Sequence, residues 1–382
     1  MRLAERSILV TGATGFIGGR VCERLIQDGA TRVRALVHNV QHAARIARLP
    51  IELCPGDLMD KASLDRALDG MEFVVHLGLG HGAVVWRGTR RLLEAARSVK
   101  VNRIVHISSA AVYGLKPPAD CGTDGTLPRS TGNAYCDGKL KAERVVARFG
   151  RRGMPVVTLR PSIVCGPYSR WSTRLVERLR AGKGVLIDSG AGVCNTIQVD
   201  NLVDAIYRSL DAAGAEGQEF FVTDGEKVTW GDFIRAHAAM IHPRPPLAEL
   251  SSDEILAAWR QRGGRWRRSL REAGRTLVSP EFRDLIKRVP VGDELVTWAW
   301  YKFQALPEES RNWWRSRLRG DGQRALISEA PDIPDAETWA IQTNSVEFSI
   351  ERARRVLGYE PRISFARGME LTEEWLRFAN YL

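Results

Sequence analysis

The sequence predicts an α/β fold built on a doubly wound parallel sheet, and three observations support this prediction. Residues 8–10 form a short apolar run, which is typical of a strand buried on both faces. A glycine-rich turn follows, and from Phe16 onward the apolar residues recur at helical spacing. Strand-like runs and helical patterns then alternate as far as residue 165, which indicates parallel strands joined by crossover helices.

The turn after the first strand carries Gly12, Gly15 and Gly18 at three-residue intervals. Glycines at this spacing permit a tight turn, close approach to a pyrophosphate, and close packing of the helix on the strand. The free N–H groups at the start of the helix would then face the phosphates. Because the glycines lie between a strand and a helix, the pattern predicts a Rossmann-type dinucleotide-binding domain.

Further strands are expected over residues 32–37, 51–53, 73–77, 103–108 and 156–159, with helices over 63–68, 84–98 and 134–149. Ligands of such sheets bind beyond the carboxyl ends of the strands. The residues at these ends are Gly12, His38, Asp57, Gly78 and Ser109. We therefore expect them to line one cleft.

Composition and pattern divide the chain into three parts. Residues 1–165 form the expected dinucleotide-binding domain. Residues 166–246 and 341–382 form a smaller C-terminal substrate-binding part that is interleaved with the Rossmann core. Between them, residues 247–340 follow a stiff proline-rich segment and hold seven of the eleven tryptophans, so we expect a helical insertion rich in tryptophan and arginine.

The composition is that of an ordinary globular protein, with 44% hydrophobic and 26% charged residues among 382. No apolar run approaches the roughly 18 residues of a membrane-spanning helix, and the first strand begins too early to leave room for a signal peptide. The six cysteines are dispersed and include no Cys-x-x-Cys pair, which predicts reduced thiols. We expect a cytoplasmic protein.

The net charge of +11 is concentrated in one segment, since residues 260–320 hold 15 Lys and Arg against 7 Asp and Glu. The fold as a whole therefore does not suggest a nucleic-acid partner. Tryptophan beside arginine suits an anionic phospholipid surface, so one hypothesis is peripheral contact with the inner face of a membrane through residues 255–320. The alternatives are a helical lid over the cleft and, less favoured, a nucleic-acid or protein partner.

Tyr135 and Lys139 are the strongest candidates for proton chemistry. They are four residues apart on an expected helix and so lie one turn apart on one face. A free phenol titrates near 10, and a neighbouring ammonium would lower that pKa and make the phenol a usable proton donor or acceptor. Ser109, at a strand end beside the same cleft, could hold the reacting oxygen. A Tyr-x-x-x-Lys pair alone is weak, but the order of glycine turn, strand-end serine and Tyr-x-x-x-Lys is specific.

These segments together resemble an extended short-chain dehydrogenase/reductase of the NAD(P)-dependent epimerase/dehydratase group. The resemblance covers residues 7–240 and returns over about 345–376. It rests on the phosphate turn at 11–18 and on segments 56–58, 76–78, 108–114 and 160–167. Together with the strand-end position of His38, it implies cofactor contacts from Gly12, Thr14, Gly15, Phe16, Ile17, Gly18, His38, Asp57, Leu58, Leu77, Gly78, Tyr135, Lys139, Pro161 and Val164.

Two departures from the family pattern bear on the chemistry. The family usually has an asparagine, whose carbonyl supports a water relay, at the position of Val85. Nucleotide-sugar enzymes often place an arginine against the diphosphate at the position of Cys194. The first departure weakens the standard proton relay, and the second weakens the sugar-nucleotide interpretation.

We expect an enzyme that transfers hydride between a nicotinamide and a carbinol or ketone carbon, as an oxidoreductase or an epimerase. Tyr135 would act as acid and base, Lys139 would lower its pKa and hold the ribose, and Ser109 would polarise the oxygen. The first substrate hypothesis is a nucleotide-linked sugar, and the alternative is a bulky hydrophobic alcohol or ketone of the hydroxysteroid type. A catalytically silent NAD(P)-sensing regulator is the rival from another class, although it need not keep all three residues.

Three further expectations concern ligands and partners. His81, Arg170 and Arg174 are candidate substrate contacts, and no metal site is expected, because His38 and His42 have no carboxylate or cysteine nearby. NADP is preferred over NAD, since no Asp or Glu occurs between Asp28 and Glu52, while Arg34 and Arg45 could meet a 2′-phosphate. The resemblance implies a homodimer formed through the helices at 84–98 and 134–149.

Overall fold

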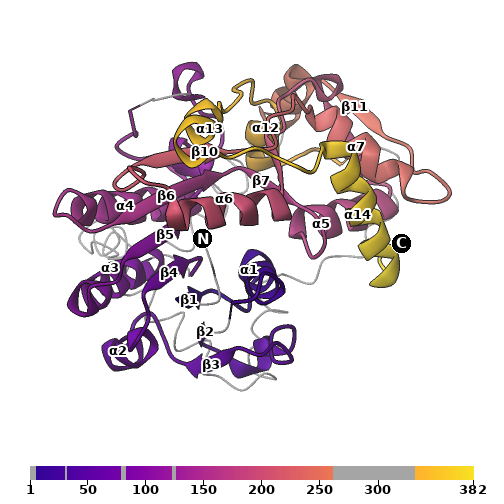
Figure 1. Cartoon of the computed structure of the whole chain (residues 1–382). Helices are drawn as coiled ribbons and strands as arrows, with labels where there is room; N and C mark the ends of the chain where they lie inside the picture. Colours follow the sequence, from indigo (N-terminus) through magenta and orange to yellow (C-terminus); the bar gives the residue numbers. More distant parts are fainter. Residues whose placement is uncertain (1–5, 31, 79–82, 123–125, 261–331) are drawn as a thin grey trace, which may run out of the picture.

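The computed structural model describes residues 6–30, 32–78, 83–122, 126–260 and 332–382. Within these residues, seven parallel strands form one sheet in the order β10-β6-β5-β4-β1-β2-β3 (Figure 1). The strands are β1 (Ser7–Thr11), β2 (Arg32–Val37), β3 (Glu52–Pro55), β4 (Phe73–His76), β5 (Arg103–Ile107), β6 (Val156–Pro161) and β10 (Glu219–Val222). The order of the strands reverses between β1 and β4, which is the point where such sheets form a ligand crevice.

Helices cover both faces of this sheet, as the doubly wound prediction requires (Figure 1). One face is covered by α1 (Phe16–Gln27), α6 (Val199–Asp211) and α13 (Glu351–Leu357). The other is covered by α2 (Lys61–Leu68), α3 (Ala83–Val99) and α4 (Ala134–Gly150). Every residue of β1, β4 and β5 is buried, because each strand is covered on both sides.

A smaller part of the protein stands beyond the carboxyl ends of the strands. It contains α5 (Arg170–Arg180), α7 (Trp230–Ala239), α12 (Ala336–Gln342) and α14 (Phe365–Phe378). Two short parallel pairs, β7 (Ile163–Cys165) with β9 (Thr196–Gln198) and β8 (Val185–Ile187) with β11 (Ala248–Leu250), complete it. An apolar cluster with residues from α5, α7 and α14 forms its core.

The expected elements of the sheet are present with small shifts at their ends. β2 has the predicted bounds, α4 is one residue longer than predicted, and Gly358 ends α13 in the left-handed conformation with φ 63°. The short strands β7, β8 and β11 were not predicted, because three residues are too few to show an alternating pattern.

The two ends of the 247–340 segment are part of the described structure. β11 pairs with β8, and Trp259 donates through Nε1 to the carbonyl of Pro334 at 3.0 Å while its ring meets Trp339 edge-on. Residues 261–331, which carry most of the expected tryptophan and arginine clusters, lie outside the described residues. Most residues of the membrane-contact hypothesis lie in this range. The candidate substrate contact His81 lies in the undescribed segment 79–82.

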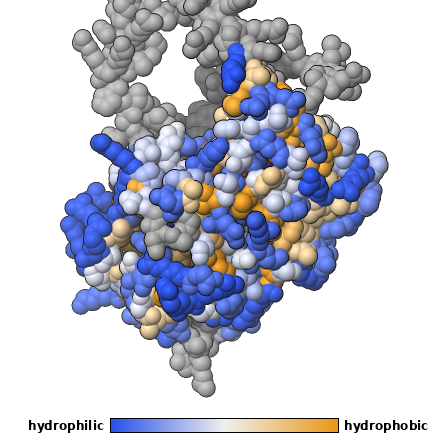
Figure 2. All heavy atoms as spheres, turned by 90° about the horizontal axis from the view of Figure 1, so that it is seen from above, coloured by the Kyte–Doolittle hydropathy of each residue, from blue (hydrophilic) through white to orange (hydrophobic). Residues whose placement is uncertain are grey.

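None of the helices in the described part of the chain is long and apolar enough to cross a membrane. Seen from the top of Figure 1, the surface exposes apolar residues in patches near the middle of the face, with hydrophilic residues around them (Figure 2).

Candidate active site

The glycine turn between β1 and α1 has the shape that a dinucleotide pyrophosphate requires. Gly12 has φ +71°, and a Cβ there would lie 2.8 Å from the backbone of Leu77. A Cβ at Gly18 would overlap the carbonyl oxygen of Gly12. The N-cap of α1 is Gly15, so no side chain there accepts from the first N–H groups of the helix. The first turn of α1 also holds no acidic residue. The N–H groups at this helix start are therefore open to an anion, so the residues fit an NAD(P) pyrophosphate.

The other predicted cofactor contacts follow at neighbouring strand ends. His38 follows β2, and its Nδ1 lies 3.6 Å from the Asp57 carboxylate beyond β3. Leu58 packs beside Gly78, where a Cβ would come within 2.6 Å of the leucine side chain. Pro161 ends β6 and Val164 lies in β7, and both are buried next to residues that line the cavity described below.

The two arginines expected to meet a 2′-phosphate are occupied by protein partners. Arg34 donates to the carbonyl of Asp69 at 2.7 Å and pairs with Glu52 at 2.7 Å. Arg45 donates to Glu23 at 2.8 Å, and its guanidinium lies 4.0 Å from the centre of the Tyr168 ring. The prediction that these two side chains favour NADP was wrong in its residues, because acceptors distant in sequence hold both of them.

Helix α4 places the predicted acid–base residues along one face. Asn133 caps the helix by accepting from the N–H groups of Tyr135 and Cys136 at 3.0 and 3.2 Å. Lys139 is buried one turn after Tyr135, and its Nζ donates to the carbonyl of Ile107 at 3.0 Å. Glu143 lies one turn further on and forms a buried ion pair with Arg160.

Ser109 and Tyr135 are brought together at the end of β5. The Ser109 hydroxyl accepts from the N–H of Ala111 at 3.2 Å, capping the short 3₁₀ helix η3 (Ala110–Tyr113). The Tyr135 side chain lies near enough for the Ser109 hydroxyl to influence its ionisation. The Tyr135 ring is 48% exposed, on the side that faces the cavity. The site thus presents two hydroxyl groups to the same space.

The pKa values of this group differ from the sequence expectation. Desolvation raises the pKa of Tyr135 above its usual value, although the nearby Ser109 hydroxyl opposes this rise. Burial lowers the pKa of Lys139 to about 8, and the nearby Glu143 carboxylate moves it back up. The phenol is therefore protonated at neutral pH. The side chain that favours the phenolate form of Tyr135 is Ser109, whereas Lys139 was the residue expected to lower this pKa.

Two buried histidines of the sheet, His76 and His106, lie near Lys139. His76 and His106 are paired in register on β4 and β5, and their rings stack at 5.3 Å. His76 hydrogen-bonds with Thr11 at 2.7 Å and with Thr89 at 3.0 Å. Burial lowers the pKa of His76 to about 3, so this imidazole is neutral and serves the packing of the strand ends.

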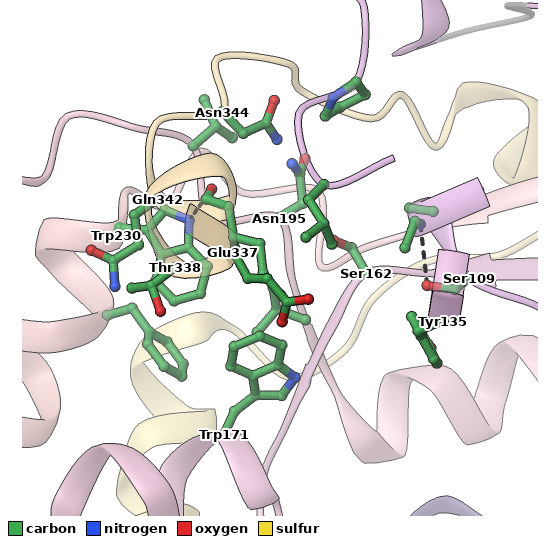
Figure 3. Close-up of a pocket in the computed structure, with 18 of the residues that line it drawn as sticks. Ser109, Tyr135, Ser162, Trp171, Asn195, Trp230, Glu337, Thr338, Gln342 and Asn344 are labelled. Carbon is green, nitrogen blue, oxygen red and sulfur yellow. Dashed lines mark hydrogen bonds between the residues drawn. The ribbon is translucent and has the colours of Figure 1, made fainter. Parts of the chain in front are cut away.

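A cavity of about 620 Å³ opens above Ser109 and Tyr135 (Figure 3). Its other lining residues come mainly from α5, α7, α12 and nearby loops. They include Ser162, Arg170, Trp171, Arg174, Arg178, Asn195, Trp230, Phe233, Glu337, Thr338, Gln342, Asn344 and Phe348. The predicted substrate contacts Arg170 and Arg174 both line this space, and neither pairs with another residue of the described part of the chain.

Several cavity residues were not predicted from the sequence. Asn133 precedes the helix at 134–149 and could have been found as its N-cap. Trp230 and Glu337 carry no local signal, because they reach the cavity only through the packing of distant helices. At the first departure from the family pattern, the backbone carbonyl of Val85 accepts a hydrogen bond from the Thr89 hydroxyl at 2.7 Å. At the second departure, Cys194 is buried in the apolar cluster of the smaller part.

A glycine turn, a strand-end serine and a Tyr-x-x-x-Lys helix thus meet at one edge of a doubly wound sheet. The sequence profile described as the NAD dependent epimerase/dehydratase family matches residues 8–222. The chain belongs to this family. Its members are NAD(P)-dependent oxidoreductases and epimerases, so the protein is an enzyme of that class.

Two curated members of the epimerase/dehydratase family illustrate the range of relatives. The chain is 30% identical to sterol demethylase protein B of Methylococcus capsulatus over 254 residues, covering 63% of this chain and 76% of that one. It is 29% identical to the N-acetyl-α-D-glucosaminyl-diphospho-ditrans,octacis-undecaprenol 4-epimerase of Escherichia coli O157:H7, covering 55% and 65% of the two chains.

The fold of the family is also found in solved structures. The UDP-glucuronic acid 4-epimerase of Bacillus cereus, solved in complex with NAD, is similar to this chain with a TM-score of 0.64 and 18% identity. The similarity covers 98% of this chain and 99% of that one. At this identity the likeness establishes the shared fold.

Proposed function

We propose that the protein catalyses NAD(P)-dependent hydride transfer at a carbinol or ketone carbon held in the cavity above Ser109 and Tyr135. The observation that carries this proposal is that the hydroxyl-bearing side chains of Ser109 and Tyr135 line that cavity together. The bound nicotinamide supplies or accepts the hydride. Ser109 would hold the reacting oxygen, and Tyr135 would give it a proton or take one from it.

The raised pKa of Tyr135 bears on its role as acid and base. A protonated phenol can donate to a ketone oxygen during reduction, and the phenolate that remains can take the proton back during oxidation. Lys139 would keep the start of α4 in place through its bond to Ile107 and contact the ribose of the cofactor. The presence of all three side chains supports catalysis over the alternative of a silent NAD(P)-sensing regulator.

The preferred cofactor in this proposal is NADP. β2 ends at Val37, and the following His38 and Asn39 offer no carboxylate to the 2′-hydroxyl of the adenosine ribose. With Arg34 and Arg45 engaged elsewhere, the proposal rests on this missing carboxylate and on the exposed His38.

For the substrate, the first candidate is a nucleotide-linked sugar. Arg170 and Arg174 lie one turn apart on α5, line the cavity and have no ion-pair partner in the described residues. Their guanidinium groups suit a diphosphate, and Trp171 beside them offers a ring on which a base could stack. The relative from Escherichia coli, whose name describes a sugar-diphosphate epimerase, supports this choice.

The second candidate is a bulky hydrophobic alcohol or ketone of the hydroxysteroid type. Trp230, Phe233 and Phe348 line the same cavity, and the position of the family's diphosphate arginine is the buried Cys194. The sterol demethylase relative supports this alternative.

A substrate panel with both cofactors tests the proposal. UDP-glucose, UDP-N-acetylglucosamine and a 3-hydroxysteroid would be incubated with the protein and NAD or NADP. Nicotinamide absorbance and product chromatography would report oxidation, reduction or epimerisation. Cofactor binding without turnover of any compound would favour the regulator instead.

We also propose two partners. A homodimer would form through α3 and α4. Sedimentation velocity at micromolar concentration would test it, and a monomer would count against it.

Residues 255–320 would contact anionic membranes of the cytoplasmic face. Liposome co-sedimentation at low and high salt tests this, with a variant lacking residues 261–320 as control, because Ile255 and Trp259 belong to the packed structure.

A further inference from the structure

Helix α12 forms a polar wall of the cavity, although it follows the tryptophan-rich segment and lies outside the residues matched by the family profile. It contributes a carboxylate, a hydroxyl and an amide from Glu337, Thr338 and Gln342. Figure 3 shows these side chains together around the cavity that also holds Ser109 and Tyr135. Helices α5 and α7 supply Trp171, Trp230 and Phe233, together with the arginines of α5.

The position of α12 is fixed by contacts along its whole length. Trp230 donates through Nε1 to the carbonyl of Ile341 at 3.0 Å. Trp339 donates through Nε1 to the Ser252 hydroxyl at 2.9 Å, and the Lys116 ammonium lies 4.5 Å from the centre of its ring. The N–H of Val193 donates to the carbonyl of Asn344 just beyond the helix at 2.6 Å. The polar side chains of α12 are therefore held at the cavity before a ligand binds.

Glu337 connects this wall to the acid–base residue. Its Oε1 accepts from the Nδ2 of Asn133 at 2.8 Å, and the same asparagine caps α4 two residues before Tyr135. Its second oxygen has no hydrogen-bond partner in the described part of the chain. A carboxylate can accept several hydrogen bonds, so acceptor capacity remains at this wall of the cavity, which Tyr135 also lines.

We propose that Glu337 is a specificity residue that accepts a hydrogen bond from a hydroxyl group of the substrate, next to the carbon that exchanges hydride. This inference rests on the proposed function. Glu337 is exposed in the unliganded protein, so a ligand that displaced its water without offering a hydroxyl group would leave the carboxylate unpaired. Glu337 thus selects a hydroxylated substrate such as a nucleotide-linked sugar and rejects a purely hydrophobic ketone.

The competing explanation is that Glu337 only ties α12 to α4. The substitution Glu337→Gln distinguishes a substrate contact from a structural tether. The amide oxygen of glutamine can still accept from Asn133, while the negative charge is lost. Glu347→Gln is the matched control, since Glu347 is an exposed glutamate of the same C-terminal segment that does not line the cavity. Thermal melting of both variants would report any loss of the tether.

Equilibrium binding of UDP-glucose and UDP to the full chain provides the test. Wild-type protein should bind UDP-glucose more tightly than UDP, which lacks the sugar hydroxyls. Glu337→Gln should raise the Kd of UDP-glucose about tenfold and leave the Kd of UDP and the melting temperature unchanged. Glu347→Gln should change none of these values.

The inference is overturned if Glu337→Gln binds UDP-glucose as the wild type does, if the two compounds bind equally to the wild type, or if neither binds. Because binding does not depend on turnover, these outcomes are distinct from failure of the proposed function. If UDP-glucose binds through Glu337 but no substrate of the panel reacts, only the catalytic proposal fails.

Discussion

Arg160 and Glu143 form a buried, two-pronged ion pair that joins β6 to the helix carrying the acid–base residues. The distances are 2.6 Å from Nη2 to Oε2 and 3.0 Å from Nε to Oε1. Both side chains are buried, and Arg160 also reaches the Tyr113 hydroxyl at 3.3 Å. Since Glu143 lies one turn beyond Lys139, the pair holds this part of α4 against the end of β6.

Glu143→Gln should destabilise the protein, because it leaves the Arg160 charge buried without its partner. We expect a loss of about 3–5 kcal/mol in the free energy of unfolding. Urea denaturation would measure it, with Glu347→Gln as the exposed control. The double variant Glu143→Gln/Arg160→Met should recover part of the loss, because no buried charge remains. A single variant as stable as the control would contradict the importance of this pair.

Tyr135→Phe should abolish turnover while the cofactor still binds. The substitution removes the hydroxyl that exchanges the proton and leaves the ring in place, so a rate loss of about 10²–10⁴-fold is expected. Steady-state kinetics with the substrate found in the panel, together with cofactor titration by fluorescence, would separate the two effects. A rate close to that of the wild type would remove Tyr135 from its proposed role.

Lys139→Met should lower both the rate and the affinity for the cofactor, and it should also change how stability depends on pH. The pKa of Lys139 falls from its ordinary 10.5 to about 8 in the folded protein. Between these values the unfolded chain binds more protons, so the free energy of unfolding rises with pH, by roughly 3 kcal/mol in total. Denaturation curves between pH 7 and 10.5 should show this rise in the wild type relative to Lys139→Met. Parallel curves for the two proteins would argue against a charged, buried Lys139.

Arg174→Gln should weaken the binding of an anionic substrate without changing the chemical step. We expect KM to rise about tenfold with kcat unchanged, because the guanidinium would contact a remote anionic group of the substrate. Arg152→Gln, an exposed arginine on the far end of the α4 region, makes the same charge change outside the cavity. An equal effect of the two substitutions would point to a general charge effect and away from a contact.

The cofactor preference can be tested by titration with NADP and NAD. The absence of a carboxylate at the end of β2 predicts a lower Kd for NADP. His38→Asp should reverse the order, because the new carboxylate would accept from the ribose hydroxyls and repel a 2′-phosphate. Tighter binding of NAD by the wild type would refute the preference.

Much of the fold and of the catalytic group follows from local patterns in the sequence. The glycine spacing at 12, 15 and 18, the buried strand runs and the helix at 134–149 each depend on neighbours within one or two turns. Such patterns report which face of an element is buried and which residues share that face. They therefore predicted that Tyr135 and Lys139 lie one turn apart, and that Ser109 stands at a strand end.

The partners of long side chains were decided by the tertiary structure. Arg34 and Arg45 were expected to face a phosphate, but they bind acceptors that the chain brings to them from other elements. Likewise, the hydrogen bond between Asn133 and Glu337 joins residues 204 positions apart. A local pattern carries no information about which distant acceptor arrives beside a flexible side chain, since that depends on how the helices pack around the sheet. The sequence by itself determined the α/β fold and its proton-transfer residues, whereas packing determined the cavity wall and the pairing of its charges.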